Sequence, residues 1–173
     1  MIKKAKSLLF SNRKNKKDLK KEAKSSDDSE KLLENDNQPN DQLSLEKHEI
    51  DKPIEPPKVE LESLINLYSE GKYSEVLALI NDLLSQFPYS VDLHNIAGAS
   101  NAGLRKFDDS INNYKQAIKI NPDFADAHNN IGNAFLGKGE LDNAITSYKK
   151  ASLVKPDYTE AYLNMGNALM DKG

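Results

Sequence analysis

Residues 125–158, ADAHNNIGNAFLGKGELDNAITSYKKASLVKPDY, decide the fold, because the chain carries a similar stretch immediately before them. Aligned without gaps, residues 91–124 and 125–158 share 12 identities in 34 positions, where ordinary composition gives about 2. Prolines and glycines keep the same 34-residue period beyond these two stretches: Pro88, Pro122 and Pro156, and Gly98, Gly132 and Gly166. A period of this length indicates a repeat architecture, in which each unit is one supersecondary element.

Each unit has the hydrophobic pattern of a helical hairpin. The first half of 125–158 follows the i, i+3, i+4, i+7 spacing of one helix face, with His128, Ile131, Gly132 and Phe135. Asp142 is the predicted N-cap of a second helix, whose apolar stripe is Ala144, Ile145, Tyr148 and Ala151. Pro156 ends that helix, because proline lacks the N–H that the helix requires. The small residues predict close helix approach: Gly98, Gly132, Ala117 and Ala151.

This pattern resembles the tetratricopeptide repeat (TPR) family. The matching features are a glycine in the first helix, an aromatic residue or leucine at the turn, an alanine late in the second helix and a closing proline. The resemblance implies an all-α fold, a right-handed superhelix of helix-turn-helix units. It covers residues 57–173, as units 57–90, 91–124 and 125–158 and a partial unit 159–173. The first unit departs from the pattern with Leu64, Val76 and Leu83, as terminal repeats often do.

The N-terminal third has a different composition. Residues 1–24 hold ten Lys/Arg and two acids, a net charge of +8, whereas residues 25–62 hold twelve acids and four lysines, a net charge of −8. Such a segment buries too little apolar surface to offset its ordering entropy. We predict a disordered tail over residues 1–56, basic over 1–24 and acidic over 25–56. Contact of residues 3–24 with an anionic surface is the alternative to a solvated tail, and no nucleic-acid partner is expected.

Several functional classes are disfavoured. The chain has no cysteine, so it has no disulfide, thiolate metal site or cysteine nucleophile. It has no apolar stretch of 18 residues, and SLLF is too short for a secretory signal, so we expect a cytoplasmic protein without a membrane span. GNAFLGKG at 132–139 lacks the final Ser/Thr of a phosphate-binding loop. We expect no catalytic residues, no metal and no cofactor.

The asparagines of the first helices are the candidate binding residues. Asparagine is a poor helix former, yet it recurs on one helix face, where the TPR resemblance places a concave groove. An amide side chain offers a donor and an acceptor, the complement of a peptide unit. The predicted peptide-binding residues are Asp126, Asn129, Asn130, Asn133, Glu160, Asn164 and Asn167. The alternative is a solvated face copied by duplication. A basic carboxylate clamp is disfavoured, because Asn95 and Asn129 stand where it needs lysines.

Two functional hypotheses follow from the resemblance. The first is a scaffold that binds a peptide or protein segment in the groove. The second is the substrate-recruiting part of a longer enzyme, because the asparagine rows are similar to those of O-linked N-acetylglucosamine transferases; a glycosyltransferase, sulfotransferase or methyltransferase domain would then follow Gly173. The missing partner of the last helix, which leaves Tyr162, Met165 and Leu169 without cover, favours a truncated sequence.

Overall fold

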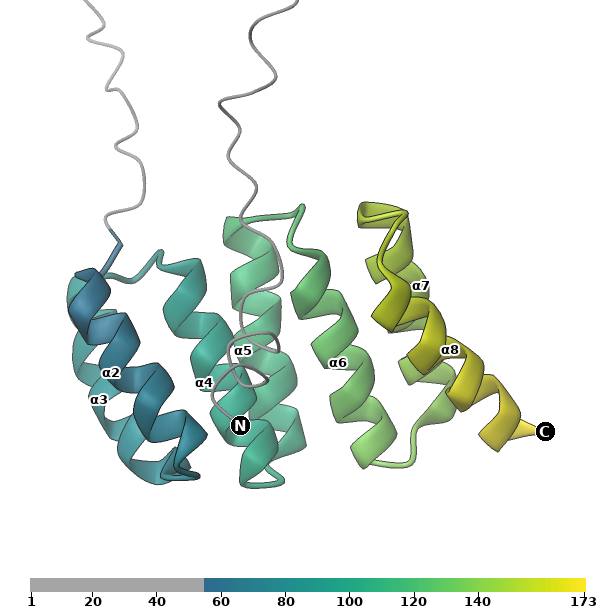
Figure 1. Cartoon of the computed structure of the whole chain (residues 1–173), viewed down its shortest axis with the longest axis horizontal. Helices are drawn as coiled ribbons and strands as arrows, with labels where there is room; N and C mark the ends of the chain where they lie inside the picture. Colours follow the sequence, from purple (N-terminus) through teal and green to yellow (C-terminus); the bar gives the residue numbers. More distant parts are fainter. Residues whose placement is uncertain (1–54) are drawn as a thin grey trace, which may run out of the picture. The chain divides into compact units, whose positions relative to one another are not determined.

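A computed structural model describes residues 55–173. This part of the chain is all-α and contains seven helices and no strand (Figure 1): α2 (Lys58–Ser69), α3 (Tyr73–Gln86), α4 (Val91–Gly103), α5 (Phe107–Ile120), α6 (Ala125–Gly137), α7 (Leu141–Val154) and α8 (Thr159–Lys172). Each 34-residue unit of the sequence contains two helices. The predicted disorder of residues 1–56 lies, up to residue 54, outside the described part.

The helices are stacked in chain order. Each helix packs against the next one, and α2, α4, α6 and α8, the first helices of their units, also pack on one another: α2 on α4, α4 on α6 and α6 on α8. This is the α-solenoid arrangement predicted from the repeat. We call the surface formed by α2, α4, α6 and α8 the first-helix face. Within the described part, no helix is long and apolar enough to cross a membrane.

The helices of one hairpin approach closely where glycine faces tyrosine. A Cβ placed on Gly98 would lie 2.7 Å from Cε1 of Tyr114, and one on Gly132 would lie 2.4 Å from Cε1 of Tyr148. Tyr148 is fully buried, so its ring has no room to retreat. Both glycines are therefore required by packing, because a methyl group would overlap the aromatic ring.

The first hairpin solves the same packing problem with different side chains. Leu64 stands at the glycine position and Ile80 at the tyrosine position, and each is 1% exposed in one core cluster. A larger residue on the first helix is thus combined with a smaller one on the second. The departure of unit 57–90 from the repeat pattern is a paired exchange of volume, which cores tolerate better than either single change.

Contacts between units use a second glycine, which the sequence analysis did not single out. Tyr73 lies against Gly103 and Phe107 lies against Gly137, with ring atoms 2.6 Å from the position of an added Cβ in both cases. The aromatic residue at the turn of one unit therefore packs on the end of the first helix of the next.

Capping differs from the prediction at α7. Asp142 does not cap this helix, which begins at Leu141; its N-cap is Glu140, two residues before the predicted cap, and no side chain makes a cap bond. The prediction was wrong because the left-handed Gly139 (φ +78°) tightens the turn and brings Leu141 into the first helical turn. Asp142 instead lies in the first helical turn, where its negative charge interacts favourably with the helix dipole. Its Oδ1 also pairs with Nζ of Lys172 at 2.5 Å.

In the part of the chain that the structure describes, the last helix packs against α7 and α6, and part of its apolar surface is exposed. Met165 contacts the cluster of Ala144, Tyr148 and Ala168, so it is better covered than expected. Tyr162 is 48% exposed and Leu169 50%, and an added Cβ on Gly166 would meet no atom within 4 Å. Gly166 therefore lacks the aromatic contact that Gly98 and Gly132 make.

Candidate functional site

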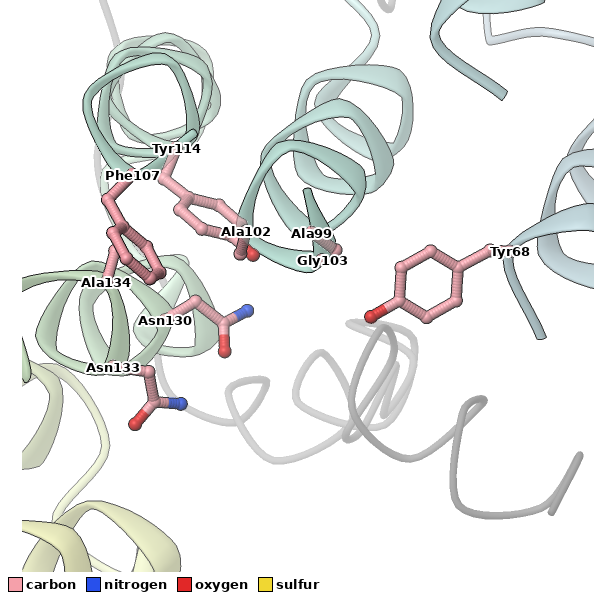
Figure 2. A pocket seen from close by; sticks show the side chains of 9 residues that line it. All are labelled: Tyr68, Ala99, Ala102, Gly103, Phe107, Tyr114, Asn130, Asn133 and Ala134. Carbon is pink, nitrogen blue, oxygen red and sulfur yellow. The ribbon is translucent and has the colours of Figure 1, made fainter. Parts of the chain in front are cut away.

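A pocket of about 160 Å³ opens where three first helices meet. Tyr68 comes from α2, the small residues of its wall from α4, two aromatic rings from α5 and two asparagines from α6 (Figure 2). Tyr68 lies across the pocket from Phe107, Asn130 and Asn133. The full lining is Tyr68, Ala99, Ala102, Gly103, Phe107, Tyr114, Asn130, Asn133 and Ala134. The pocket combines an aromatic wall with two amide groups, a composition typical of sites that hold small ligands or anchoring side chains.

The asparagines form a hydrogen-bonded network that joins α6 to α8. Nδ2 of Asn164 donates to Oδ1 of Asn129 at 3.1 Å and to Oδ1 of Asn133 at 3.4 Å. Nδ2 of Asn129 in turn donates to Oε1 of Glu160 at 3.3 Å. Four of the seven predicted binding residues are therefore brought together by bonds within the protein. This inter-repeat role was not predicted from the sequence.

Asn133 also supports the core. The hydroxyl of Tyr148 donates to Oδ1 of Asn133 at 2.8 Å. Burial, together with the nearby carboxylate of Glu160, raises the pKa of Tyr148 to about 12, so the hydroxyl keeps its proton at neutral pH. Asn133 is itself exposed, and its oxygen is the acceptor for a donor on a fully buried side chain.

The predicted binding residues differ in how far they reach solvent. Asn130 and Asn133 line the pocket, whereas Asn129 is only 1% exposed. Asp126 is buried, Glu160 and Asn164 are half-buried, and Asn167 is exposed. The aromatic residues of the pocket were not predicted from the sequence: Tyr68, Phe107 and Tyr114. The one signal available for Phe107 was the aromatic residue expected at the turn of the repeat, and no repeated pattern singled out Tyr68.

Charge is distributed unevenly between the two sets of helices. Apart from histidine, α4 and α6 each contain a single ionisable residue, the acids Asp92 and Asp126, and neither contains Lys or Arg. The equivalent residue of α8 is Glu160, whose carboxylate meets α6 through Asn129. The second helices α5 and α7 carry lysines instead. The first-helix face is therefore acidic and amide-rich.

His128 gives the array a pH dependence. Burial, with a smaller contribution from Lys150, lowers the pKa of His128. The folded protein then binds fewer protons than the unfolded chain as pH falls through about 6.5, so the free energy of unfolding decreases there. Between about pH 7.5 and about pH 5.5, the melting temperature of the wild type should fall further than that of His128→Gln. Equal losses in thermal melts of the two proteins would contradict this expectation.

The part of the chain that is described holds no group of three or more His, Cys, Asp and Glu residues placed to bind a metal ion. What the first-helix face does offer is hydrogen-bonding amides, carboxylates and an aromatic pocket. These groups suit noncovalent recognition of an extended polar backbone with an apolar side chain.

Comparison with known proteins agrees with this geometry. A sequence model of the TPR repeat matches residues 105–139 and 132–173. The first TPR of Spaghetti (RPAP3), solved with the HSP90 peptide SRMEEVD, is 20% identical, with a TM-score of 0.61 over 65% of this chain and 90% of that chain. The second TPR domain of human RPAP3, solved with the HSP70 peptide SGPTIEEVD, is 17% identical, with a TM-score of 0.59 over 63% of this chain and 91% of that chain.

A crystal structure of MamA is 25% identical, with a TM-score of 0.62 over 66% of this chain and 67% of that chain. No curated protein matches the sequence. The structural neighbours share the fold of residues 55–173.

Proposed function

This chain is a tetratricopeptide-repeat protein, and we propose that its first-helix face binds an extended segment of a partner protein. The observation that carries the proposal is the pocket in which Asn130 and Asn133 stand beside Tyr68, Phe107 and Tyr114. The amides would hydrogen-bond the partner backbone, and the aromatic wall would hold one apolar side chain.

The charge of the face supports one class of segment over another. The two RPAP3 domains were solved with peptides that end in EEVD. Here Asn95 and Asn129 occupy the positions at which a clamp for such peptides would need lysines, and Asp92 and Asp126 add negative charge. Like charges across an interface cost binding energy, so a neutral or basic segment is the expected partner.

The test uses short fluorescent peptides that share a central Leu-Phe pair and differ in flanking lysine, serine or glutamate. Anisotropy titrations with the full chain should give affinities in the order lysine, serine, glutamate. Asn130→Ala with Asn133→Ala should raise the Kd of the lysine peptide about 5- to 150-fold, as expected for two lost hydrogen bonds of about 0.5–1.5 kcal/mol each. Methylating the peptide backbone nitrogens should weaken binding more than scrambling the residues outside the Leu-Phe pair.

The control separates a loss of peptide affinity from a loss of folding stability. Both asparagine changes are made in a Tyr148→Phe background, which removes the buried hydroxyl that Asn133 satisfies. The matched control is Asn113→Ala on the second helix α5, whose amide bonds the carbonyl of Asp109. Unchanged affinity in the double variant, or an equal loss in the control, would overturn the proposal.

Recruitment of substrates to a transferase domain beyond Gly173 stays a prediction. The gene sequence downstream of that codon tests it directly, because a catalytic domain there would have its own recognisable motifs.

A further inference from the structure

The first-helix face and the N-terminus of the same chain have complementary chemistry. Acids recur on the face at the repeat spacing, as Asp92, Asp126 and Glu160, and α4 and α6 carry no Lys or Arg. Asp92 and Asp126 are each 6% exposed and Glu160 is half-buried, and a carboxylate at reduced dielectric attracts a nearby cation more strongly than a fully solvated one does. A segment that presents lysines together with a bulky apolar side chain would therefore complement both the negative charge of these positions and the pocket.

Residues 3–10, KKAKSLLF, are a segment of this kind. Lys3, Lys4 and Lys6 are followed by Leu8, Leu9 and Phe10. The acidic stretch 25–56 could also attract the lysines, but it contains no aromatic residue and offers nothing comparable to the pocket for the apolar end. The combination of charge and apolar side chains favours the first-helix face as the place where this segment binds.

The connection between the two is long enough. Glu55 accepts a hydrogen bond from Oγ of Ser90 at 2.5 Å, which fixes the start of the described chain beside the N-terminus of α4. Residues 11–54 then separate the segment from this anchor, and a connection of that many residues can extend to at most about 145 Å. A helix of 13 residues such as α4 is about 20 Å long, so the segment reaches every part of the face.

We propose that residues 3–10 occupy the first-helix face as an internal ligand, with an apolar side chain in the pocket lined by Tyr68 and Phe107 and the lysines beside Asp92 and Asp126. The inference rests on the proposed function, because it assigns an occupant to the same face. A partner segment would have to displace residues 3–10 before it could bind. At an effective concentration of about 1 mM, a segment with a Kd near 100 µM weakens an external ligand about tenfold.

The absence of cysteine makes the experiment direct, since a single introduced thiol takes a spin label without background. A label on Ser11→Cys in the full chain should broaden the NMR signals of Tyr68, Asn130 and Asn133, whereas a label on Ser25→Cys should not. Charge reversal by Lys3→Glu, Lys4→Glu and Lys6→Glu should abolish the broadening, and so should about 1 M salt, where the screening length falls to about 3 Å. The same reversal should tighten binding of the lysine-flanked peptide about tenfold.

Three results would overturn the inference. These are broadening confined to the second helices or to residues 25–54, broadening that survives the charge reversal, or unchanged peptide affinity. Asp92→Asn with Asp126→Asn should also abolish the broadening caused by the label on Ser11→Cys. If that variant does not fold, the charge reversal of the three lysines remains as the test. If residues 3–10 bind anionic vesicles while the NMR signals of the first-helix face stay sharp, these residues contact a membrane surface instead. If the lysine-flanked peptide binds but the label does not localise, only this inference fails; if the peptide does not bind even to the reversed chain, the proposed function fails.

Discussion

Replacing Gly132 with alanine should lower the free energy of unfolding by about 1–3 kcal/mol, whereas the same change at Gly166 should raise it by up to about 1 kcal/mol. The two glycines occupy the same repeat position in α6 and α8. A Cβ on Gly132 would lie 2.4 Å from the buried ring of Tyr148, while a Cβ on Gly166 would meet no atom within 4 Å. At Gly166 only the gain in helix propensity remains.

Urea titrations of the wild type and the two variants measure both effects, and unchanged m-values would show that the unfolded states remain comparable. Gly132→Ala in a Tyr148→Leu background is the internal control, because removing the ring should remove most of the overlap. Losses of equal size at Gly132 and Gly166 would mean that the Gly132–Tyr148 contact does not determine the stability of the third hairpin.

Asn133→Ala should also destabilise the protein, by about 1–3 kcal/mol, even though Asn133 is exposed. The change removes the acceptor for the hydroxyl of Tyr148, which is fully buried. From sequence alone, alanine would be expected to preserve or improve folding at this position, since it is the better helix former by about 0.5–0.7 kcal/mol. The structure reverses the sign of that expectation.

A double-mutant cycle isolates the free energy that the hydrogen bond between Tyr148 and Asn133 contributes to folding. In a Tyr148→Phe background the donor is gone, so Asn133→Ala should cost less than about 0.5 kcal/mol or become favourable. Asn167→Ala, the equivalent change in α8, is the matched single variant, because no hydroxyl of a following helix bonds it in the described chain. Additive free energies around the cycle would contradict the proposed support of the core by Asn133.

The repeat predicts the fold because its signals are local and repeated. Three copies of the glycine and proline pattern predict the helix pairs, and the family match and the solved structures confirm the all-α TPR fold. The N-cap of α7 was predicted at Asp142 and lies two residues earlier, at Glu140, because the conformation of Gly139 depends on the geometry of the turn. Boundaries of this kind depend on backbone details that residue types do not specify.

The candidate site was predicted in part. The asparagines attract attention because they oppose helix propensity, and Asn130 and Asn133 do line a pocket. Their bonds to Tyr148 and to one another depend on which helices become neighbours, and this follows from the packing of whole units. The aromatic wall was missed for the same reason, since Tyr68 of α2 and Phe107 of α5 are far apart in sequence and line one pocket only when the units pack.

The two ways of filling the hairpin core have an evolutionary consequence. To convert a Gly132–Tyr148 unit into a Leu64–Ile80 unit, two substitutions are needed, and each is harmful on its own: leucine at 132 collides with the ring, and isoleucine at 148 leaves a void. Both single-substitution intermediates between the two types of unit are therefore less stable than either type. After a duplication, the exposed positions of a unit can change independently. The residues at the two paired core positions should change rarely, so they should still show from which type of unit a copy descends.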